Sequence, residues 1–331
     1  MATSRSAGAA LLEDGWRDFA EIELLHDDGG RARRALAEQV LLPRFAARSR
    51  ADVIHSLAST APARPRVPSV VTLHDVTFFQ HKTFSPVTTF GLRRTVTAGA
   101  RGAAGFIAAS EAARDEICAV LGLDPAAFTV VPHGPGRTAG VAPAPAHAVR
   151  ELYALGDNRV LLSVGAKRPH KNQEVLVRAA GSLPADVVLV LAGHPEPYDQ
   201  ELRGIARELG VTGRIRFVDY VGDDELEALW RLSAASAQPT LAEGFGLPVL
   251  EAMAHGVATA CSDIAVLREV GGDVPYYFDP HDSLSATAAI EAALSDPGAG
   301  GRGRERAALF TWKRAAEQTF VAYERALSAR S

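Results

Sequence analysis

The feature that most constrains the fold of this chain is a regular alternation between short apolar runs and longer amphipathic stretches. The apolar runs are rich in valine and isoleucine, and helical patterns such as residues 172–182, 198–209, 223–234 and 247–255 separate them. Nearly continuous apolar strands alternating with helices indicate parallel sheets that are covered on both faces. The sequence therefore predicts an α/β fold. The candidate strands are residues 21–25, 52–58, 69–75, 105–110, 128–134, 159–165, 187–193, 215–221, 235–240, 257–263 and 274–280.

The length of the chain predicts two domains. It has 331 residues, and a typical domain has roughly 150. Residues 134–146 contain several prolines and glycines and almost no large apolar side chain, which is typical of a linker or hinge. We expect an N-terminal domain over residues 1–140 and a second domain over 141–310.

The last segment, residues 311–331, predicts a separate helix. Apolar side chains recur there at helical spacing, among them Trp312, Phe320 and Tyr323, and this face must be buried against something. The glycine-rich residues 298–304 would let the helix leave the second domain. We therefore expect the helix to pack back on the N-terminal domain.

Composition excludes several classes of protein. The chain is 47% hydrophobic and 22% charged, which argues against disorder and coiled coil, and its net charge of −4 argues against a nucleic-acid partner. Cys118 and Cys261 have no metal-ligand spacing. The absence of a signal peptide or an apolar run of about 20 residues predicts a cytoplasmic protein. Six arginines form a basic cluster in the sequence: Arg31, Arg33, Arg34, Arg44, Arg48 and Arg50. We expect this cluster to be an ordinary solvated face, and the alternative is peripheral contact with the inner face of a membrane.

Polar groups that follow a strand are candidate ligand contacts, because open parallel sheets bind ligands beyond the carboxyl ends of their strands. The richest such segment runs from Glu243 to Glu251. Gly244 and Gly246 would let backbone N–H groups approach a ligand, and the helix that begins near Pro248 favours an anion at its N-terminus. A simple strand-to-helix turn with a glutamate cap explains the same residues equally well.

A second strand-to-helix turn, residues 163–172, places Lys171 at the entry of a helix, where it would add positive charge to an anion site. The chain has only four lysines, so this placement argues slightly against an ordinary solvated turn. Lys167 and Arg168 are ambiguous, and we expect both to be exposed.

Histidines and metal motifs are less informative. His74 ends an apolar strand and could hydrogen-bond a sugar hydroxyl or a phosphate, although a structural histidine explains it about as well. His133 and His194 are weaker candidates, and we expect His55 to be structural. No metal-binding or nucleoside-triphosphate motif is present, so the sequence predicts no metal and no cofactor.

As a set, these segments resemble the retaining family 4 glycosyltransferases, which have the GT-B fold of two facing, doubly wound Rossmann-like domains. The resemblance runs from about residue 36 to the end and is strongest over 159–263. The segments that carry it are RVLLSVGAKRPHKN, VVLVLAGHP, IRFVDYVGDDELEALW and AEGFGLPVLEAMAHGVATACSD.

The resemblance implies roles for individual residues. Glu243 would bind the hydroxyls of the donor sugar, Glu251 the ribose and Lys171 the phosphates, while His74 would lie near the transferred sugar. The implied catalytic residues are His74, Lys171 and Glu243. The implied donor contacts are Gly165, Lys167, Lys171, Gly193, Val221, Gly244, Phe245, Gly246, Leu247 and Glu251.

Two departures from the family pattern stand out. Many members have an arginine where this chain has Ala166, so Lys167 or Arg168 would substitute for it, or Lys171 would act alone. Members also open with a strand and a glycine-rich loop, which we do not expect in this chain. This second departure concerns the side of the protein that binds the acceptor.

The expected reaction moves a sugar from a nucleoside diphosphate sugar to an acceptor hydroxyl with retention of configuration and without a metal. The acceptor, which could be a glycan, a glycolipid or a small molecule, is not identified by the sequence, and neither is the oligomeric state. Two alternatives stay open. One is another GT-B enzyme, such as a sugar-nucleotide epimerase or a phosphorylase, and the other is a catalytically degenerate partner subunit that only binds the sugar nucleotide.

Overall fold

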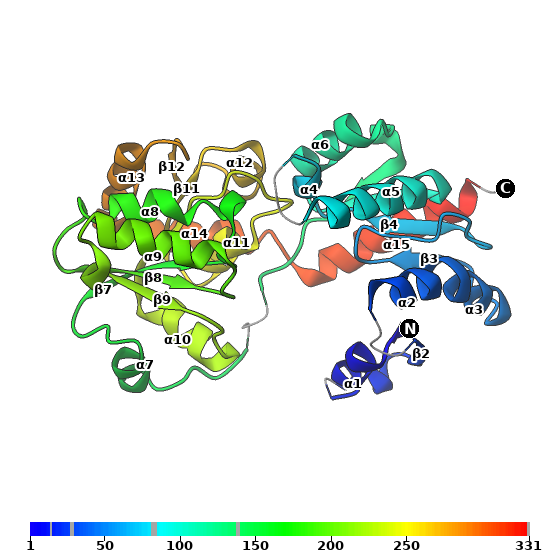
Figure 1. Ribbon diagram of the computed structural model, residues 1–331, viewed down its shortest axis with the longest axis horizontal. Helices are drawn as coiled ribbons and strands as arrows, with labels where there is room; N and C mark the ends of the chain where they lie inside the picture. The colour runs from blue at the N-terminus through cyan, green and yellow to red at the C-terminus, as the bar shows by residue number, and fades with distance from the viewer. Residues whose placement is uncertain (14, 27–29, 81–84, 137–139, 330–331) are drawn as a thin grey trace.

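The computed structural model describes residues 1–13, 15–26, 30–80, 85–136 and 140–329. Within this part of the chain lie a four-stranded and a six-stranded sheet, both entirely parallel, and a separate two-stranded sheet. The two larger sheets and their helices form two bodies side by side (Figure 1). The predicted α/β fold with two parallel sheets is confirmed.

The six-stranded sheet is doubly wound. Its strands are β7 (Arg159–Val164), β8 (Val187–Ala192), β9 (Ile215–Val218), β10 (Ser233–Gln238), β11 (Ala258–Ser262) and β12 (Tyr276–Phe278). They are ordered β12-β11-β10-β7-β8-β9, so the chain starts in the middle, builds to one edge, and then crosses to build the other half. The order reverses between β7 and β10, and such a switch point opens a crevice at the carboxyl ends of the strands.

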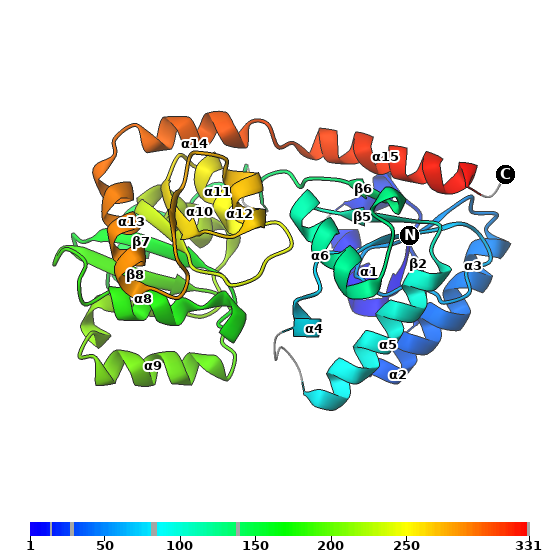
Figure 2. The same ribbon diagram turned by 90° about the horizontal axis from the view of Figure 1, so that it is seen from above.

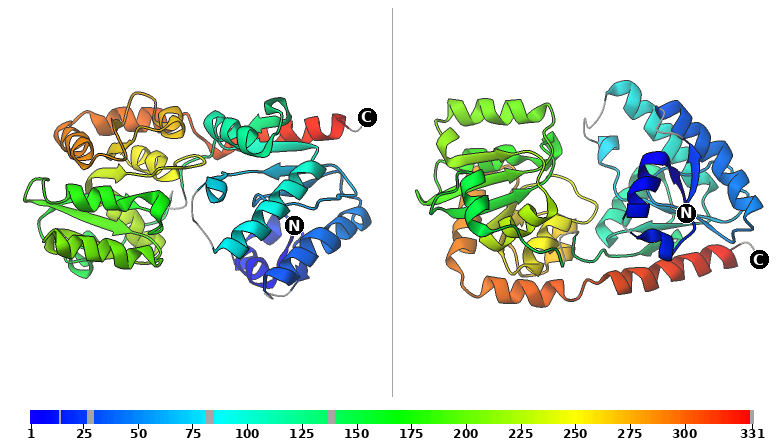
Figure 3. Two further views of the ribbon diagram at one scale, coloured as in Figure 1. Left: turned by 45° about the horizontal axis from the view of Figure 1, so that its top comes forward. Right: turned by 90° about the horizontal axis from the view of Figure 1, so that it is seen from below.

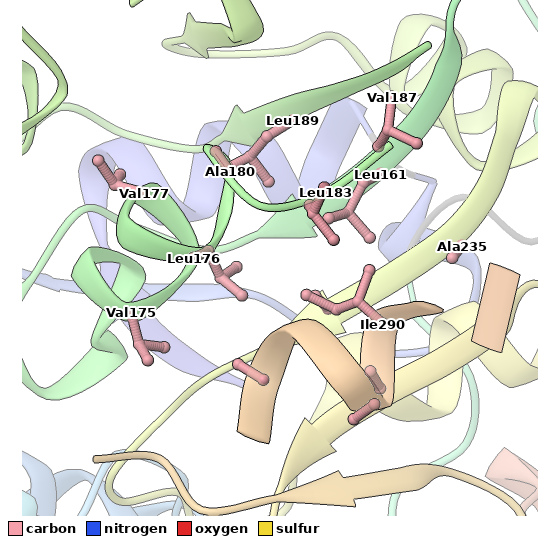
Figure 4. Packing of buried hydrophobic residues seen from close by; sticks show 14 of the residues in the cluster. Leu161, Val175, Leu176, Val177, Ala180, Leu183, Val187, Leu189, Ala235 and Ile290 are labelled. Atoms are coloured by element: carbon pink, nitrogen blue, oxygen red, sulfur yellow. The ribbon is translucent and has the colours of Figure 1, made fainter. Parts of the chain in front are cut away.

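Helices cover both faces of this sheet, and both faces are packed. Leu161 of β7 and Leu189 of β8 contact one cluster, which includes Leu176 and Ile290 (Figure 4). Their neighbours in sequence belong to a second cluster on the opposite face. Burial on both faces explains the nearly continuous apolar strands. The helices are α7 (Ala146–Leu152), α8 (Gln173–Ala179), α9 (Tyr198–Glu208), α10 (Asp223–Leu232), α11 (Leu247–Ala254), α12 (Ala265–Gly271) and α13 (Ser283–Ser295), with short 3-10 turns η4 (Pro169–Lys171) and η5 (Thr212–Arg214).

The four-stranded sheet has the simple order β3-β4-β5-β6. Its core contains Val71, Phe106 and Phe128, and the two phenylalanine rings stack with centroids 4.9 Å apart. Its strands are β3 (Ile54–Ser56), β4 (Ser69–Thr72), β5 (Gly105–Ala108) and β6 (Phe128–Val130). Its helices are α2 (Arg31–Leu36), the π-helical η2 (Ala37–Leu41), α3 (Leu42–Arg48), α4 (Thr77–Gln80), α5 (Pro86–Gly102), α6 (Glu111–Leu121) and the 3-10 turn η3 (Pro125–Ala127).

The N-terminal residues form a small unit of their own. Strand β1 (Ala2–Ser4) pairs in parallel with β2 (Glu23–His26), and α1 (Arg5–Glu13) and the 3-10 turn η1 (Trp16–Asp18) lie between them. This unit is the dark blue part of Figure 3. The expectation that the chain shows no strand at its start is wrong, since β1 is present, but β1 and β2 pair with each other and not with the four-stranded sheet.

Two consecutive helices, α14 (Ala299–Ala307) and α15 (Trp312–Ser328), run along one side of both bodies (Figure 2). Most of residues 298–304 belong to α14, so the segment that leads out of the second domain is helical. Their glycines permit close packing: a Cβ at Gly300 would lie only 2.2 Å from the carbonyl oxygen of Gly256. Helix α15 packs through Ala315, Ala322 and Ala326 against the four-stranded sheet.

The expected linker, residues 134–146, carries no helix or strand over 134–136 and 140–145, and residues 137–139 lie outside the described part. The indole Nε1 of Trp312 donates a hydrogen bond of 2.9 Å to the carbonyl oxygen of Pro135. The two segments that connect the bodies are therefore joined to each other.

The predicted basic cluster lies at the surface. Arg33, Arg34, Arg44 and Arg48 are exposed on α2 and α3, Arg50 is exposed just after α3, and the side chain of Arg31 is outside the described residues. None of the helices that the structure describes combines the length and the apolar character that crossing a bilayer would require.

His55 is structural, as expected, and makes the fold sensitive to acid. Its Nδ1 lies 2.8 Å from the hydroxyl of Tyr323 on α15, and its Nε2 lies 2.8 Å from the hydroxyl of Thr72 on β4. Burial, with a smaller contribution from the charge of His74, lowers the pKa of His55 from 6.5 to about 4. The folded state therefore disfavours the protonated ring.

We predict that the free energy of unfolding falls as the pH drops from 6.5 towards 4, because only the unfolded chain takes up this proton readily. Between pH 7 and pH 5, His55 should account for about 1 to 2 kcal/mol of the loss, allowing for its partial exposure. Urea unfolding of the parent and of His55→Gln at both pH values measures this. An equal loss in the two proteins would contradict the prediction.

Candidate functional site

Two cavities open at the carboxyl ends of the parallel strands. The first, here called the interdomain cavity, has a volume of about 310 Å³. The second, here called the strand-end cavity, has a volume of about 400 Å³ and lies within the second domain. The interdomain cavity is lined by Ala58, Ser59, His74, Asp75, Thr77, Phe78, Leu92, Arg168, His170, Lys171, Ala242 and Glu243. The strand-end cavity is lined by Val164, Gly165, Ala166, Ala192, Gly193, His194, Asp219, Tyr220, Val221, Leu226 and Glu251.

The interdomain cavity contains an ion pair between Lys171 and Glu243. The Nζ of Lys171 lies 2.5 Å from Oε1 of Glu243, and both side chains are mostly buried. Lys171 follows β7 and Glu243 follows β10, the strands on either side of the switch point. Residues that are 72 positions apart in sequence are thus brought together by the topology of the sheet.

Backbone conformation holds the two turns against each other. Asn172 has a left-handed φ of 54°, which asparagine tolerates better than most residues. Its side-chain amide donates to the carbonyl oxygens of Pro239, at 3.0 Å, and Pro280, at 2.7 Å. The N–H of Leu241 donates to the carbonyl oxygen of His170 at 2.8 Å. These bonds set the separation of Lys171 and Glu243.

The turn before α11 brings the second domain against the first. A Cβ at Gly244 would lie 2.0 Å from the carbonyl oxygen of His74, so only glycine fits. The hydroxyl of Ser110 donates to the carbonyl oxygen of Gly244 at 3.0 Å. Gly246 has a φ of 91° and precedes Leu247, the first residue of α11. The glycines therefore serve close approach and the sharp entry into the helix.

Phe245, between these glycines, points into the core. Its side chain is buried, and its ring lies 5.1 Å from that of His133 and 5.9 Å from that of Phe310, measured between centroids. Only its backbone is therefore available for the ligand contact that the sequence predicts. His133 also stacks on Trp312, and burial, with a smaller contribution from His74, lowers its pKa.

His74 faces the interdomain cavity from the first domain. Its Nε2 lies 2.7 Å from the carbonyl oxygen of Leu57, which can only accept a hydrogen bond, so Nε2 carries the proton. In the neutral ring, Nδ1 is then an acceptor. Such a group can receive a hydrogen bond from a hydroxyl in the cavity.

Glu251 lies within α11 and lines the strand-end cavity. Its carboxylate fits against the linker at Gly136, where a Cβ would come within 1.5 Å of its Oε1. Glu243 and Glu251 thus line different cavities. This arrangement suits a ligand that extends past the N-terminus of α11.

Two glycines line the strand-end cavity where β7 and β8 end. Gly165 and Gly193 have φ values of 157° and 148°, and a Cβ at Gly193 would lie 2.2 Å from the carbonyl oxygen of Gly165. The ends of β7 and β8 therefore meet backbone to backbone. Val221, a further predicted contact, is buried and lines the same cavity.

Lys167 departs from expectation, because it is fully buried. Its Nζ donates to the carbonyl oxygens of Gly193, at 2.7 Å, and Val218, at 2.8 Å, and lies 3.7 Å from Asp199 and 3.8 Å from Asp219. Burial lowers the pKa of this ammonium, and the two carboxylates partly offset the effect. The expectation that Lys167 is exposed is therefore wrong. The expected direct contact with a ligand is wrong as well, because Lys167 lines neither cavity.

Arg168, expected to be exposed, is only half-exposed and donates to the carboxylate of Glu196 at 2.7 Å. Arg168 lines the interdomain cavity together with Lys171. Of Lys167 and Arg168, it is therefore the one placed to substitute for the arginine that many family members have where this chain has Ala166. Asp219 and Tyr220, which line the strand-end cavity, were not among the predicted site residues. Both directly follow β9, where ligand contacts are expected in an open parallel sheet, so the sequence could have pointed to them.

No cluster of three or more metal-ligating side chains occurs among the described residues.

Family models match both halves of the chain. The model described as Glycosyltransferase Family 4 matches residues 8–135, and the model described as Glycosyl transferases group 1 matches residues 149–309. The O-antigen chain mannosyltransferase B of Escherichia coli is 34% identical over 190 residues, which are 55% of this chain and 50% of that protein. The D-inositol 3-phosphate glycosyltransferase of Kineococcus radiotolerans is 32% identical over 257 residues, which are 68% of this chain and 58% of that protein. The chain thus spans about half the length of these curated relatives.

Solved structures share the GT-B architecture. Sucrose-phosphate synthase from Thermosynechococcus elongatus superposes with a TM-score of 0.72 at 21% identity, covering 94% of this chain and 84% of that one. The Anabaena protein HepE, in a crystal structure with UDP and glucose, superposes with a TM-score of 0.73 at 20% identity, covering 94% of this chain and 87% of that one. At this identity the likeness shows the fold.

We predict that Gly244→Ala forces the two domains apart at the interdomain cavity. The new methyl group meets a backbone oxygen that cannot rotate away, so the variant should lose about 1 to 3 kcal/mol of stability. Gly204→Ala, in α9 with open space around it, is the matched control and should gain about 0.5 to 1 kcal/mol. Denaturant unfolding measures both. Equal stability of the two variants would contradict the prediction.

Proposed function

Because the chain belongs to the family 4 glycosyltransferases of the GT-B fold, we propose that it transfers a sugar from a nucleoside diphosphate sugar to an acceptor hydroxyl with retention of configuration. The observation that carries the proposal is the pair Lys171 and Glu243 at the switch point, opposite His74 of the first domain. These three groups face one cavity. The cation can bind the phosphates of a sugar diphosphate, and the carboxylate and the imidazole can accept hydrogen bonds from its sugar hydroxyls.

The diphosphate belongs beside Lys171 and the first turn of α11. The unpaired N–H groups at a helix N-terminus attract an anion, and a lysine adds a full charge. With the donor bound, the ammonium of Lys171 faces phosphate oxygens as well as Glu243. The nucleoside then extends into the strand-end cavity, where Glu251 accepts hydrogen bonds from the ribose.

The sugar belongs between Glu243 and His74. Glu243 accepts hydrogen bonds from sugar hydroxyls, and Nδ1 of the neutral His74 ring accepts one from the opposite side. Domain contact at Gly244 places the two groups across one cavity. Closure of the two domains around the donor would exclude water and limit its hydrolysis.

The reaction exchanges one bond for another at the anomeric carbon. The acceptor oxygen forms a bond to this carbon while the bond from the carbon to the diphosphate oxygen breaks, and the acceptor proton passes to that oxygen. Attack from the same face as the leaving group retains the configuration without a protein nucleophile. Lys171 and the N–H groups of α11 stabilise the charge that grows on the diphosphate, so the proposal includes no metal ion.

The relatives favour transfer over the alternatives. Those reported above are named as a mannosyltransferase and an inositol phosphate glycosyltransferase, and neither name denotes an epimerase, a phosphorylase or a binding subunit. A binding subunit would bind the nucleotide without turnover with any acceptor. Release of nucleoside diphosphate that depends on an added glycan, glycolipid or small-molecule acceptor distinguishes transfer from both alternatives.

We predict that Lys171→Met weakens the binding of nucleoside diphosphates about 10- to 100-fold, since charge-assisted hydrogen bonds to phosphate are lost. Isothermal titration calorimetry measures the change. Lys313→Met, which removes an exposed lysine of α15, is the matched control and should bind like the parent. Equal affinity of the Lys171 variant and the control would remove Lys171 from the phosphate site.

We predict that Glu243→Gln affects transfer more than binding. The variant keeps the shape but loses the charge that orients the sugar and Lys171, so kcat should fall about 100-fold while the Kd for nucleoside diphosphate changes little. Steady-state kinetics beside calorimetry separates the two effects. Glu208→Gln, at an exposed position of α9, is the control. An unchanged kcat would exclude Glu243 from the reaction.

A further inference from the structure

One carboxylate in the strand-end cavity has no part in the function proposed so far. Asp219 directly follows β9, and its side chain is 60% exposed. It lines the cavity together with Gly193, Val221 and Glu251. The cavity thus contains a charged acceptor beyond the group assigned to the ribose.

Asp219 is held in place from two directions. Its backbone carbonyl oxygen accepts a hydrogen bond of 3.1 Å from the N–H of Gly193. Its Oδ1 lies 3.8 Å from the ammonium of Lys167, which is itself fixed by the carbonyl oxygens of Gly193 and Val218. A buried cation requires such partners, because an unpaired charge in the interior is very costly.

Lys167 therefore ties the ends of β8 and β9 together and keeps a negative charge facing the cavity. Its other acidic neighbour, Asp199 on α9, is engaged by Arg203 at 2.6 Å. Asp219 differs from Asp199 in its exposure, which is 60% against 11% for the side chains. One lysine at 3.8 Å leaves acceptor sites on the Asp219 carboxylate, which has about four.

The position of Asp219 suits contact with the base of the nucleotide. The diphosphate site proposed above lies between β10 and β7, and β9 is two strands further along the sheet from β7. Two strand spacings are about 10 Å, a distance that a ribose and a base span easily. Val164, Val221 and Leu226 add apolar surface to the cavity, and the exposed ring of Tyr220 lies in its wall.

We propose that Asp219 reads the base of the donor nucleotide and selects guanine, with Lys167 as the residue that positions it. The inference rests on the proposed function, because it requires a donor nucleoside in the strand-end cavity. It adds the class of donor: a guanosine diphosphate sugar.

The chemistry of the bases favours guanine. A carboxylate can only accept hydrogen bonds, and guanine offers it two neighbouring donors, N1–H and the 2-amino group. Uracil and thymine offer one N–H between two carbonyl oxygens, which the carboxylate repels. Adenine and cytosine offer an amino group next to a ring acceptor. Guanine alone satisfies both carboxylate oxygens.

The test titrates GDP, UDP, ADP and dTDP into the full chain by isothermal titration calorimetry. We expect GDP to bind about 100-fold more tightly than the other three, because a polar site rejects bases that leave it unpaired. Tighter binding of UDP, ADP or dTDP would overturn the guanine inference and leave the proposed function intact. Binding of none of the four would overturn the proposed function itself.

Asp219→Asn should change which base the protein binds, and a variant that merely fails to fold would not gain affinity for any base. Asparagine presents one acceptor and one donor, which match N1–H and the 2-carbonyl oxygen of xanthine. The variant should therefore lose affinity for GDP about 100-fold and gain affinity for xanthosine diphosphate. Unchanged binding of GDP, or a loss without any gain for xanthosine diphosphate, would remove Asp219 from the base site.

Asp186→Asn is the matched control. Asp186 has a similar exposure, 59%, and a basic partner, Arg159, but lies where β7 and β8 begin, at the opposite edge of the sheet. This variant should bind all nucleotides like the parent.

Lys167→Met tests the positioning role. It should raise the KM for the donor and reduce the preference for GDP over UDP, while kcat at saturating donor stays near that of the parent. A lower kcat with unchanged KM and preference would contradict positioning. If the buried substitution prevents folding, the Asp219→Asn result decides the proposal.

Discussion

The geometry of the interdomain cavity depends on a close contact between the two domains, where the backbone of Gly244 meets the carbonyl oxygen of His74. Any side chain at this glycine would push the domains apart. Because the contact is direct, His74 of one domain and the pair of Lys171 and Glu243 in the other line a single cavity. The cavity is thus a product of domain placement, and neither domain contains it alone.

Further contacts support this placement. The carboxylate of Glu269 on α12 accepts hydrogen bonds from the backbone N–H groups of Glu111 and Ala112, at 2.8 and 2.9 Å, and so caps α6 from the other domain. Helices α14 and α15 run across both domains, and Trp312 joins this crossing to the linker (Figure 2). A cap on a helix N-terminus satisfies donors that would otherwise be unpaired, so it favours one docking geometry.

Much of the architecture was predictable, because local patterns encode it. Each apolar run proposed as a strand overlaps one, and the helices at residues 173, 198, 223, 247 and 312 begin within a residue or so of their expected positions. Local patterns failed where a neighbour decides the outcome. Residues 298–304 are glycine-rich, yet all of them except Gly298 are helical, because α11 packs closely against this segment. Lys167 is polar, yet it is buried because strand-end carbonyl groups surround it.

By itself, the sequence determined the α/β class, the two parallel sheets and the chemical types at the strand ends, since periodicity and turn residues act over short distances along the chain. The tertiary structure alone decided which of these groups meet. Lys171 and Glu243 pair because β7 and β10 are adjacent at the switch point, and the ammonium of the buried Lys167 lies 3.8 Å from Asp219 at the end of β9. Such pairings join residues distant in sequence, and only the packing of the strands brings them within reach of one another.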